Sequence, residues 1–270
     1  MNRRTAISIG AAMVASTFGL SSARSASPDP RVADLVKAGR IRVALAAAPV
    51  MATKDAVTGE LRGVGVDLAR ELANRIGVEF VPVVFPRPGA IMAGLKTDAW
   101  DIAFLGIDPA RAADADFSPA YLEVDLTFLV PATSAINRVP DADKPGVRIA
   151  VPRGDLVDIL LSRQIKQATL VRAETVAGAF DLLRSGQADV CAEPRTNLLQ
   201  DQARLPGSRV LADRFGVNQV AIAMPKGHAG RLAYLSEFIE SAKSSGLVQR
   251  AVERAGLRGV QVAPPAKQGS

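Results

Sequence analysis

The chain has 270 residues, a length that allows one large domain or two of ordinary size. Hydrophobic residues make up 48% of it and charged residues 22%, which is typical of a globular protein and excludes a wholly disordered chain. The formal net charge of +6 raises nucleic acid or an anionic surface as a partner, but an aromatic content of 4% argues against stacking on bases. One cysteine excludes an internal disulfide framework and one histidine excludes a His-based metal cluster, and no cofactor is expected.

Residues 1–25 have the layout of a secretory signal peptide. Arg3 and Arg4 precede a short apolar run, and two small-x-small patterns follow it, ending at Ala23 and Ser25. The twin arginines suggest Tat export, with Sec export as the close alternative; the competing interpretation is an amphipathic terminal helix. Because the run is too short for a membrane span and no cysteine lies near the cleavage site, we expect an exported periplasmic protein that is not a lipoprotein.

Half of the basic excess belongs to this segment. Residues 1–25 contain three arginines and no acid, so the mature chain keeps 30 basic and 27 acidic residues, a net charge of +3. These charges are interspersed along the expected helices, without a basic run or stripe. Nucleic-acid binding is therefore not expected.

The mature chain alternates between strand and helix patterns. Its first part predicts strands at 41–45, 78–84, 101–105 and 126–130, a helix with an apolar stripe at 64–76, and a helix through Ile91 and Leu95. Its second part predicts strands at 147–151, 169–172, 190–192 and 217–224, helices at 156–163 and 175–184, and a last amphipathic helix through Leu232 and Ile239. The Pro-rich tail, residues 261–270, is expected to be disordered.

This alternation indicates an α/β fold with mainly parallel sheets. A Pro-rich junction near residues 131–145 separates two runs of elements and suggests two lobes. A weak internal echo agrees, because Leu95, Asp101 and Ile102 recur at a constant offset of 88 as Leu183, Asp189 and Val190. In both places an Asp opens an apolar strand after a helix and a turn.

The segment 58–121 carries several short motifs in a fixed order. They are Thr58-Gly59-Glu60-Leu61-Arg62-Gly63, Val66-Asp67-Leu68-Ala69, Trp100-Asp101-Ile102-Ala103, Pro109-Ala110-Arg111 and Asp116-Phe117-Ser118-Pro119-Ala120-Tyr121. Their order and spacing resemble the family 3 bacterial extracellular solute-binding proteins, the amino-acid-type receptors of ABC importers. The resemblance extends more loosely over residues 40–255.

The resemblance implies a type II periplasmic binding protein fold, in which two α/β lobes are joined by a two-strand hinge and close on a ligand between them. The first lobe would comprise residues 28–130 and 221–260, and the second lobe residues 131–220. The site would lie at the carboxyl ends of the sheet strands, where open α/β sheets bind ligands.

Three candidate site residues follow from the first-lobe motif. The resemblance places Arg111 where the family binds a carboxylate, and a guanidinium suits that role through two parallel hydrogen bonds; the competing interpretation is an exposed helix arginine. Asp108 stands where the family often has Thr or Ser, but Asp108-Pro109 also reads as a helix N-cap followed by Pro, and the two roles are compatible. Gly106 lies where the family often has another hydroxyl-bearing residue, so a side-chain contact with the ligand is expected to be absent there.

Four candidates come from the second lobe. In the family, backbone N–H groups at the start of a helix bind the ligand's carboxylate, and the corresponding position here is Asp155 and Leu156. The Asp155 carboxylate can itself accept hydrogen bonds from those N–H groups, as an ordinary helix N-cap does. The family's ammonium-binding Asp is replaced by Pro194, which leaves Glu193 and Arg195 on either side. One interpretation is that these two residues contact the ligand. If Arg195 then faced the cleft with Arg111, a ligand with more negative charge would be favoured. The other interpretation is that Glu193 and Arg195 form an ion pair at the surface.

The remaining residues contribute packing. Met51 and Phe85, in the loops after the first two strands, are candidates for an apolar wall of the cleft. Cys191 is expected to be a buried inert thiol and His228 to lie in an exposed turn.

The sequence therefore predicts a monomeric periplasmic receptor of an ABC importer that binds a small carboxylate-bearing solute, an amino acid or related organic acid, and delivers it to an inner-membrane ABC permease. The alternative is an enzyme on the same fold, similar to cyclohexadienyl or arogenate dehydratases, with Asp108, Asp155 and Glu193 as candidate acids. A carboxyl group with a strongly raised pKa in the cleft would favour the enzyme.

Overall fold

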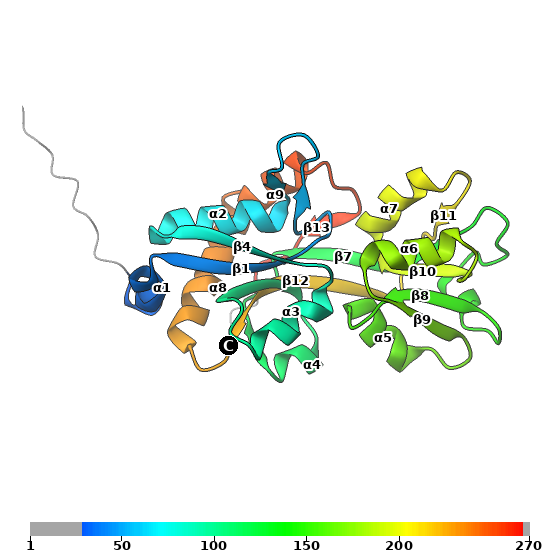
Figure 1. Cartoon of the computed structure of the whole chain (residues 1–270), viewed down its shortest axis with the longest axis horizontal. Helices are drawn as coiled ribbons and strands as arrows, with labels where there is room; N and C mark the ends of the chain where they lie inside the picture. The colour runs from blue at the N-terminus through cyan, green and yellow to red at the C-terminus, as the bar shows by residue number, and fades with distance from the viewer. Residues whose placement is uncertain (1–28, 267–270) are drawn as a thin grey trace, which may run out of the picture.

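The computed structural model describes residues 29–266, so the expected signal peptide lies outside the described residues. Two α/β lobes lie side by side (Figure 1). The elements from the start of the first lobe to the strand that leaves it are η1 (Pro30–Val32), α1 (Ala33–Ala38), β1 (Arg40–Ala46), β2 (Thr53–Lys54), β3 (Leu61–Arg62), α2 (Val64–Ile76), β4 (Glu79–Phe85), α3 (Pro88–Leu95), β5 (Ile102–Gly106), α4 (Pro109–Ala112), β6 (Ala115–Phe117) and β7 (Leu122–Val130).

The chain then builds the second lobe and returns to the first. The second-lobe elements are η2 (Val139–Ala142), β8 (Arg148–Pro152), α5 (Leu156–Gln164), β9 (Thr169–Ala173), α6 (Val176–Arg184), β10 (Val190–Pro194), α7 (Arg195–Arg204) and β11 (Arg209–Val210). The returning elements are β12 (Gly216–Pro225), α8 (Ala229–Ser244), α9 (Leu247–Arg254) and β13 (Val260–Val262). Among these helices, none is both long enough and apolar enough to cross a bilayer.

One hydrogen-bonded sheet runs through both lobes, in the order β4-β1-β5-β12-β7-β10-β8-β9 along its main path. The parallel pairs predicted for an α/β fold lie at its two ends, where β1 pairs with β4 and β5, and β8 pairs with β9 and β10. The two parallel parts are joined, because β7 pairs antiparallel with β12 through residues 122–126 and with β10 through residues 126–129. That β7 and β12 bend as a hinge stays a prediction.

Buried apolar side chains divide into separate cores. One large cluster draws on residues 32–122 and 220–252, and two smaller clusters draw on residues 126–211. The division of the chain into residues 28–130 with 221–260 and residues 131–220 remains a prediction, and the cores separate close to its boundaries.

The echo between the two halves corresponds to a repeated contact. Asp101 accepts hydrogen bonds from the backbone N–H of Arg42, at 2.7 Å, and from its guanidinium. Asp189 accepts the same two kinds of bond from Arg148, with the backbone N–H at 2.9 Å. In each lobe an Asp ahead of a central strand thus pairs with an Arg on the neighbouring parallel strand.

The expectation of a disordered tail from residue 261 is wrong for residues 261–266. Strand β13 pairs antiparallel with β7, and the N–H of Ala263 donates to Tyr121 at 3.0 Å. The Lys243 ammonium also donates to Pro264, at 2.9 Å. The exposed edge of β7 supplies the backbone partners that a Pro-rich composition does not reveal. Residues 267–270 lie outside the described range.

Helix α2 starts at a glycine that no other residue replaces without strain. Gly63 has φ of 146°, and a Cβ built on it would lie 2.5 Å from the Met51 carbonyl oxygen. The close approach holds the loop 47–52 against the start of α2.

We therefore expect Gly63→Ala to lower the free energy of unfolding by about 3 kcal/mol, since it combines an unfavourable φ with a backbone clash. The control is Gly39→Ala, because Gly39 also has a positive φ, 68°, but no atom within 4 Å of the added Cβ. Gly39→Ala should lower the free energy of unfolding by only about 1 kcal/mol, because the positive φ alone disfavours the alanine. Urea unfolding of both variants checks this, and equal losses would contradict the role of the Met51 contact.

Candidate functional site

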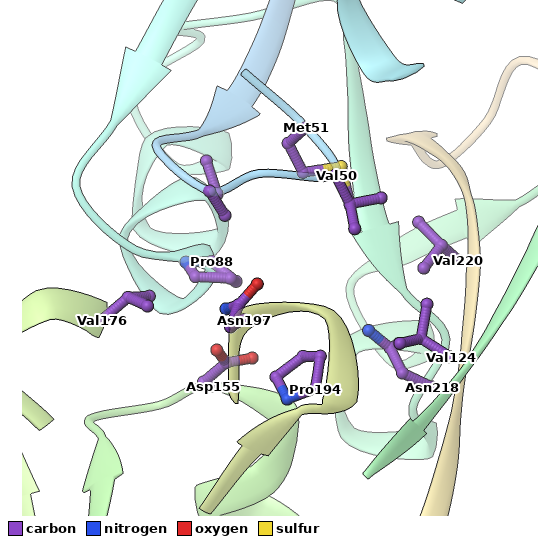
Figure 2. Close-up of a pocket in the computed structure, with 12 residues that line it drawn as sticks. Val50, Met51, Pro88, Val124, Asp155, Val176, Pro194, Asn197, Asn218 and Val220 are labelled. Atoms are coloured by element: carbon purple, nitrogen blue, oxygen red, sulfur yellow. The ribbon is translucent and has the colours of Figure 1, made fainter. Parts of the chain in front are cut away.

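A cavity of about 40 Å³ lies between the two lobes. Figure 2 shows that side chains from both lobes surround it. Its lining residues are Ala46, Ala48, Val50, Met51, Pro88, Val124, Asp155, Val176, Pro194, Asn197, Asn218 and Val220. Three of these are polar, and Asp155 is the one charged residue among them.

Arg111 is not among the residues that line this cavity, although its guanidinium lies 4.0 Å from the lining carboxylate of Asp155. Its side chain is buried, and burial lowers the pKa of the guanidinium, an effect that the nearby carboxylates oppose. It donates to the carbonyl oxygen of Gly106, at 3.0 Å, and to that of Gly154 in the second lobe, at 3.3 Å. The interpretation as an exposed helix arginine is therefore wrong, and Arg111 links the two lobes.

Asp155 is both the N-cap of α5 and a wall of the cavity. Its Oδ1 accepts a hydrogen bond from the N–H of Leu156 and lies 4.0 Å from the Arg111 guanidinium. Burial raises the pKa of its carboxyl group, and Arg111 works against that rise. The donor expected for a ligand at Leu156 is thus taken by Asp155 itself, and the Leu156 side chain packs in the second-lobe core.

Asp108 caps α4, as its pairing with Pro109 predicts. Its Oδ1 accepts from the N–H of Ala110, at 2.7 Å, and its Oδ2 lies 3.2 Å from Nη1 of Arg163 in the second lobe. Asp108 is buried but does not line the cavity. It therefore contributes a second contact across the lobes.

A third contact comes from the loop after β4. The Arg87 guanidinium donates to the carbonyl oxygen of Arg153 at 2.8 Å and lies 3.5 Å from the Glu174 carboxylate. Both partners belong to the second lobe, so three first-lobe residues, Arg87, Asp108 and Arg111, hold the lobes together in this structure.

We expect Arg163→Ala to shift the ligand-free protein toward an open arrangement of the lobes, by a few-fold in the ratio of open to closed molecules. The arginine is half exposed, so its pair with Asp108 is screened and the effect is modest. Small-angle scattering without ligand measures the shift as a larger radius of gyration. The control is Arg184→Ala, which removes an exposed pair with Asp181 inside one helix and should leave the radius unchanged. Equal radii for all three proteins would contradict the role of Arg163.

Gly106 makes room for a polar residue of the cavity. A Cβ at this position would lie 2.2 Å from Oδ1 of Asn218 and 3.2 Å from the Leu156 side chain. The absence of a side chain, read in the sequence only as a lost contact, allows Asn218 to lie beside β5.

Glu193 is not among the residues that line the cavity. It is fully buried, and its Oε2 accepts from Nδ2 of Asn197 at 2.8 Å, while its Oε1 has no hydrogen-bond partner among the described residues. Burial raises the pKa of the carboxyl group well above its ordinary value. The expected surface pair with Arg195 is therefore wrong.

Arg195 does not face the cleft with Arg111. Strand β10 ends at Pro194 and α7 begins at Arg195, so the alternation of a strand does not continue through this position. The guanidinium instead donates to the carbonyl oxygens of Leu211, at 2.8 Å, and Ala212, at 3.0 Å, and lies 3.4 Å from the Asp125 carboxylate. Arg195 thus fastens the loop before β12.

The apolar wall is partly as predicted. Met51 lines the cavity and receives the Tyr121 hydroxyl on its sulfur at 3.8 Å. Phe85 does not line it, because its ring packs against the first-lobe core beside Gly94, and Pro88 contributes to the wall instead.

The sequence interpretation missed Asn197 and Asn218. Asn197 lies in the first turn of α7, a helix that was not predicted, and Asn218 follows the start of a predicted strand. One sequence feature could have indicated Asn197. Pro194 replaces the Asp that binds the ligand's ammonium group in the family, which makes the polar residues near it candidates for the site.

Other chemically active residues stand apart from the cavity. Cys191 is fully buried and burial raises the pKa of its thiol, while His228 is exposed ahead of α8. Within residues 29–266, no group of three or more His, Cys, Asp or Glu side chains is placed to hold a metal ion.

Known proteins resemble this chain over most of its length. A glutamine-binding protein of an ABC transporter from Bacillus subtilis (strain 168) is 24% identical over 198 residues, 72% of each chain. A cyclohexadienyl dehydratase from Pseudomonas aeruginosa is 25% identical over 240 residues, 87% of this chain and 89% of the relative.

Solved structures agree on the fold. An ancestral amino acid-binding protein, described as a precursor of cyclohexadienyl dehydratase, has a TM-score of 0.73 at 27% identity and covers 83% of this chain and 98% of its own. The solute receptor for L-cysteine of Neisseria gonorrhoeae has a TM-score of 0.76 at 22% identity, covering 83% of this chain and 92% of its own. Residues 40–256 match the bacterial extracellular solute-binding proteins, family 3, and the chain therefore belongs to that family.

Proposed function

We propose that this protein is the periplasmic substrate-binding component of an ABC importer and captures a small carboxylate-bearing solute, an amino acid or a related organic acid. The observation that carries the proposal is a cavity lined by both lobes with a buried arginine, Arg111, whose guanidinium lies 4.0 Å from the lining residue Asp155. Family membership and the amino-acid-binding relatives support the same function. The ligand, export to the periplasm, an inner-membrane permease as partner and the monomeric state are parts of this proposal.

Arg111 is suited to hold the ligand's carboxylate. Two of its N–H groups are used by the carbonyl oxygens of Gly106 and Gly154, and an arginine has five such donors. Its charge is buried, and its nearest carboxylate, that of Asp155, is 4.0 Å away, which is too far for a hydrogen bond. A ligand carboxylate would add the short charge-assisted bonds that this guanidinium lacks.

Closure would couple binding to transport. The contacts from Arg87, Asp108 and Arg111 to the second lobe form only when the lobes are together. A ligand that bridges the lobes would favour this closed arrangement over an open one, because it interacts with both lobes only in the closed form. A permease would then distinguish loaded from empty receptor by shape.

The dehydratase alternative has one specific observation in its favour. Asp155 is a carboxyl group in the cavity wall with a pKa raised by burial, as a general acid requires, and one relative is a cyclohexadienyl dehydratase. The binding function is preferred because the chain belongs to a family of solute-binding proteins and the N–H of Leu156 already donates to one oxygen of this carboxylate.

A thermal-shift screen of the purified mature protein tests the proposal. The panel contains the twenty amino acids, small organic acids and amines, with hits confirmed by titration calorimetry. At least one amino acid should raise the melting temperature, since a ligand that binds only the folded form stabilises it. Absence of binding across the panel, together with turnover of prephenate or arogenate, would overturn the binding function in favour of the enzyme.

A further inference from the structure

The C-terminal strand meets the second lobe at the predicted hinge. Strand β13 pairs with β7 at residues 122–124, and β10 pairs with the same strand from residue 126 onward. Because β12 occupies the other edge of β7 over residues 122–126, β13 and β10 follow one another along one edge, with only Asp125 between them. In Figure 1, β13 lies along β7 where the two lobes meet.

Gly259 and Arg195 are in contact across this gap. Gly259 directly precedes β13, which packs on the first-lobe core through Val260 and Val262, and Arg195 is the first residue of α7 in the second lobe. A Cβ built on Gly259 would lie 2.9 Å from Cδ and 3.0 Å from Cγ of Arg195. The aliphatic stem of the arginine therefore packs directly on the backbone of the glycine, and the two lobes touch there.

The Arg195 stem is fixed in this position by the guanidinium at its end. That group donates to the carbonyl oxygens of Leu211 and Ala212 and lies 3.4 Å from the carboxylate of Asp125. These partners belong to the loop before β12 and to the middle of β7. The stem thus cannot move away from Gly259 without breaking these contacts.

The contact lies on the face of the hinge strands opposite to the ligand cavity. Successive side chains of a strand point to opposite faces. Val124 and Asn218 line the cavity, whereas Asp125 lines a separate groove of about 240 Å³ together with residues 259–261. A rotation that opens the cavity face brings the groups on the other face together, so it presses Arg195 against the start of this segment.

We propose that the C-terminal segment 259–262 is a hinge brace, in which Gly259 blocks the stem of Arg195 and limits how far the two lobes open. This inference rests on the lobe motion of the proposed function and adds a contact that controls the motion from outside the ligand cavity. The brace reduces the population of widely open molecules, so less of the ligand's binding energy is needed to close the lobes. It acts without ligand, since neither Arg195 nor any residue of the segment lines the cavity.

Spin labels on the two lobes measure the opening directly. The labels are attached through Lys96→Cys, after α3 of the first lobe, and Lys166→Cys, after α5 of the second; both positions are exposed, and the native Cys191 is buried. Electron–electron double resonance on the ligand-free mature protein gives the distribution of distances between the labels. We expect Arg195→Ala to extend this distribution beyond the longest wild-type distance, because alanine lacks the Cγ and Cδ atoms that meet Gly259.

Two further variants separate the brace from a general loosening of the structure. Arg195→Lys keeps Cγ, Cδ and a positive charge near Asp125, so it should open only as far as the wild type. Arg209→Ala removes an arginine that also fastens backbone carbonyl groups, those of Ser134 and Ile136, but does so within the second lobe. It should lower the free energy of unfolding, as Arg195→Ala does, and leave the distances between the labels unchanged.

Each result decides a separate point. Distances for Arg195→Ala that match those of the wild type overturn the brace, and so do distances that grow equally in Arg195→Lys or in Arg209→Ala. A protein that stays at one short distance in every variant overturns the lobe motion as well as the brace. Absence of binding across the amino-acid panel overturns the proposed function alone, because the distances are measured without ligand.

Discussion

Replacing Arg111 with alanine is expected to weaken binding of any amino acid that the wild type binds by about 30-fold or more. The guanidinium is buried and links the first lobe to Gly154 in the second, so its removal takes away both a carboxylate partner and a contact that closes the lobes. Loss of one partner of a buried charge pair costs about 2–5 kcal/mol in binding, which corresponds to this range. Titration calorimetry on both proteins measures it.

The same substitution should also destabilise the folded protein by about 3 kcal/mol at neutral pH, since Asp155 would remain buried without its cation. The matched control is Arg184→Ala, which removes an exposed pair with Asp181 and should change stability by less than about 0.5 kcal/mol. Unchanged ligand affinity in Arg111→Ala would show that the carboxylate is held elsewhere and would remove the main support for the site.

Replacing Glu193 with glutamine is expected to stabilise the protein increasingly as the pH rises. Burial raises the pKa of Glu193 well above its ordinary value of 4.5, with Asn197 opposing the rise and Asp201 and Asp155 adding to it. Above pH 4.5 the unfolded chain releases this proton while the folded protein keeps it, so the wild type loses stability as the pH rises toward the folded pKa. Glutamine keeps the neutral shape and accepts the same bond from Asn197.

Urea unfolding of both proteins at several pH values measures this difference. Between pH 4.5 and the folded pKa of Glu193, the free energy of unfolding of the variant should rise relative to the wild type by about 1.4 kcal/mol per pH unit. Below pH 4.5 the difference between the two proteins should be constant. Glu79→Gln is the control, because Glu79 is exposed at the start of β4, and a substitution at an exposed position should change stability by less than about 0.5 kcal/mol. A pH-independent difference for Glu193→Gln would contradict a buried, protonated Glu193.

The sequence predicted most of the scaffold because local patterns determine it. The apolar stripe of 64–76 and the αL glycine at Gly77 correspond to α2 with its C-cap. The repeated Asp101 and Asp189 correspond to equivalent contacts with Arg42 and Arg148. These features depend on neighbours within one lobe, so spacing along the chain is enough to find them.

Elements with weak periodicity or distant partners were not predicted. Helix α7 begins with polar residues after a proline, so it was not predicted, and a cleft position for Arg195 remained one of two interpretations. Strand β13 exists because β7 offers it an edge, and that edge is formed by residues more than 130 positions earlier in the chain. Neither cause can be read from the local sequence.

In the functional site, too, residues marked by the local sequence were predicted and residues that depend on distant partners were not. Arg111 and Met51 could be proposed from motif and position, and Asp155 was identified as a residue able to occupy its own helix start. The cavity itself depends on how two lobes meet, so Asn197 and Asn218 could not be found before the lobes were placed together. Gly106 shows the limit best, since its function is to leave space for a side chain 112 residues later.

A crystal structure of the protein with the amino acid that gives the largest thermal shift tests the central claim most directly. The account predicts closed lobes with the ligand between them and its carboxylate on Arg111. A ligand bound outside this cavity, or inside it without contact to Arg111, would contradict the account.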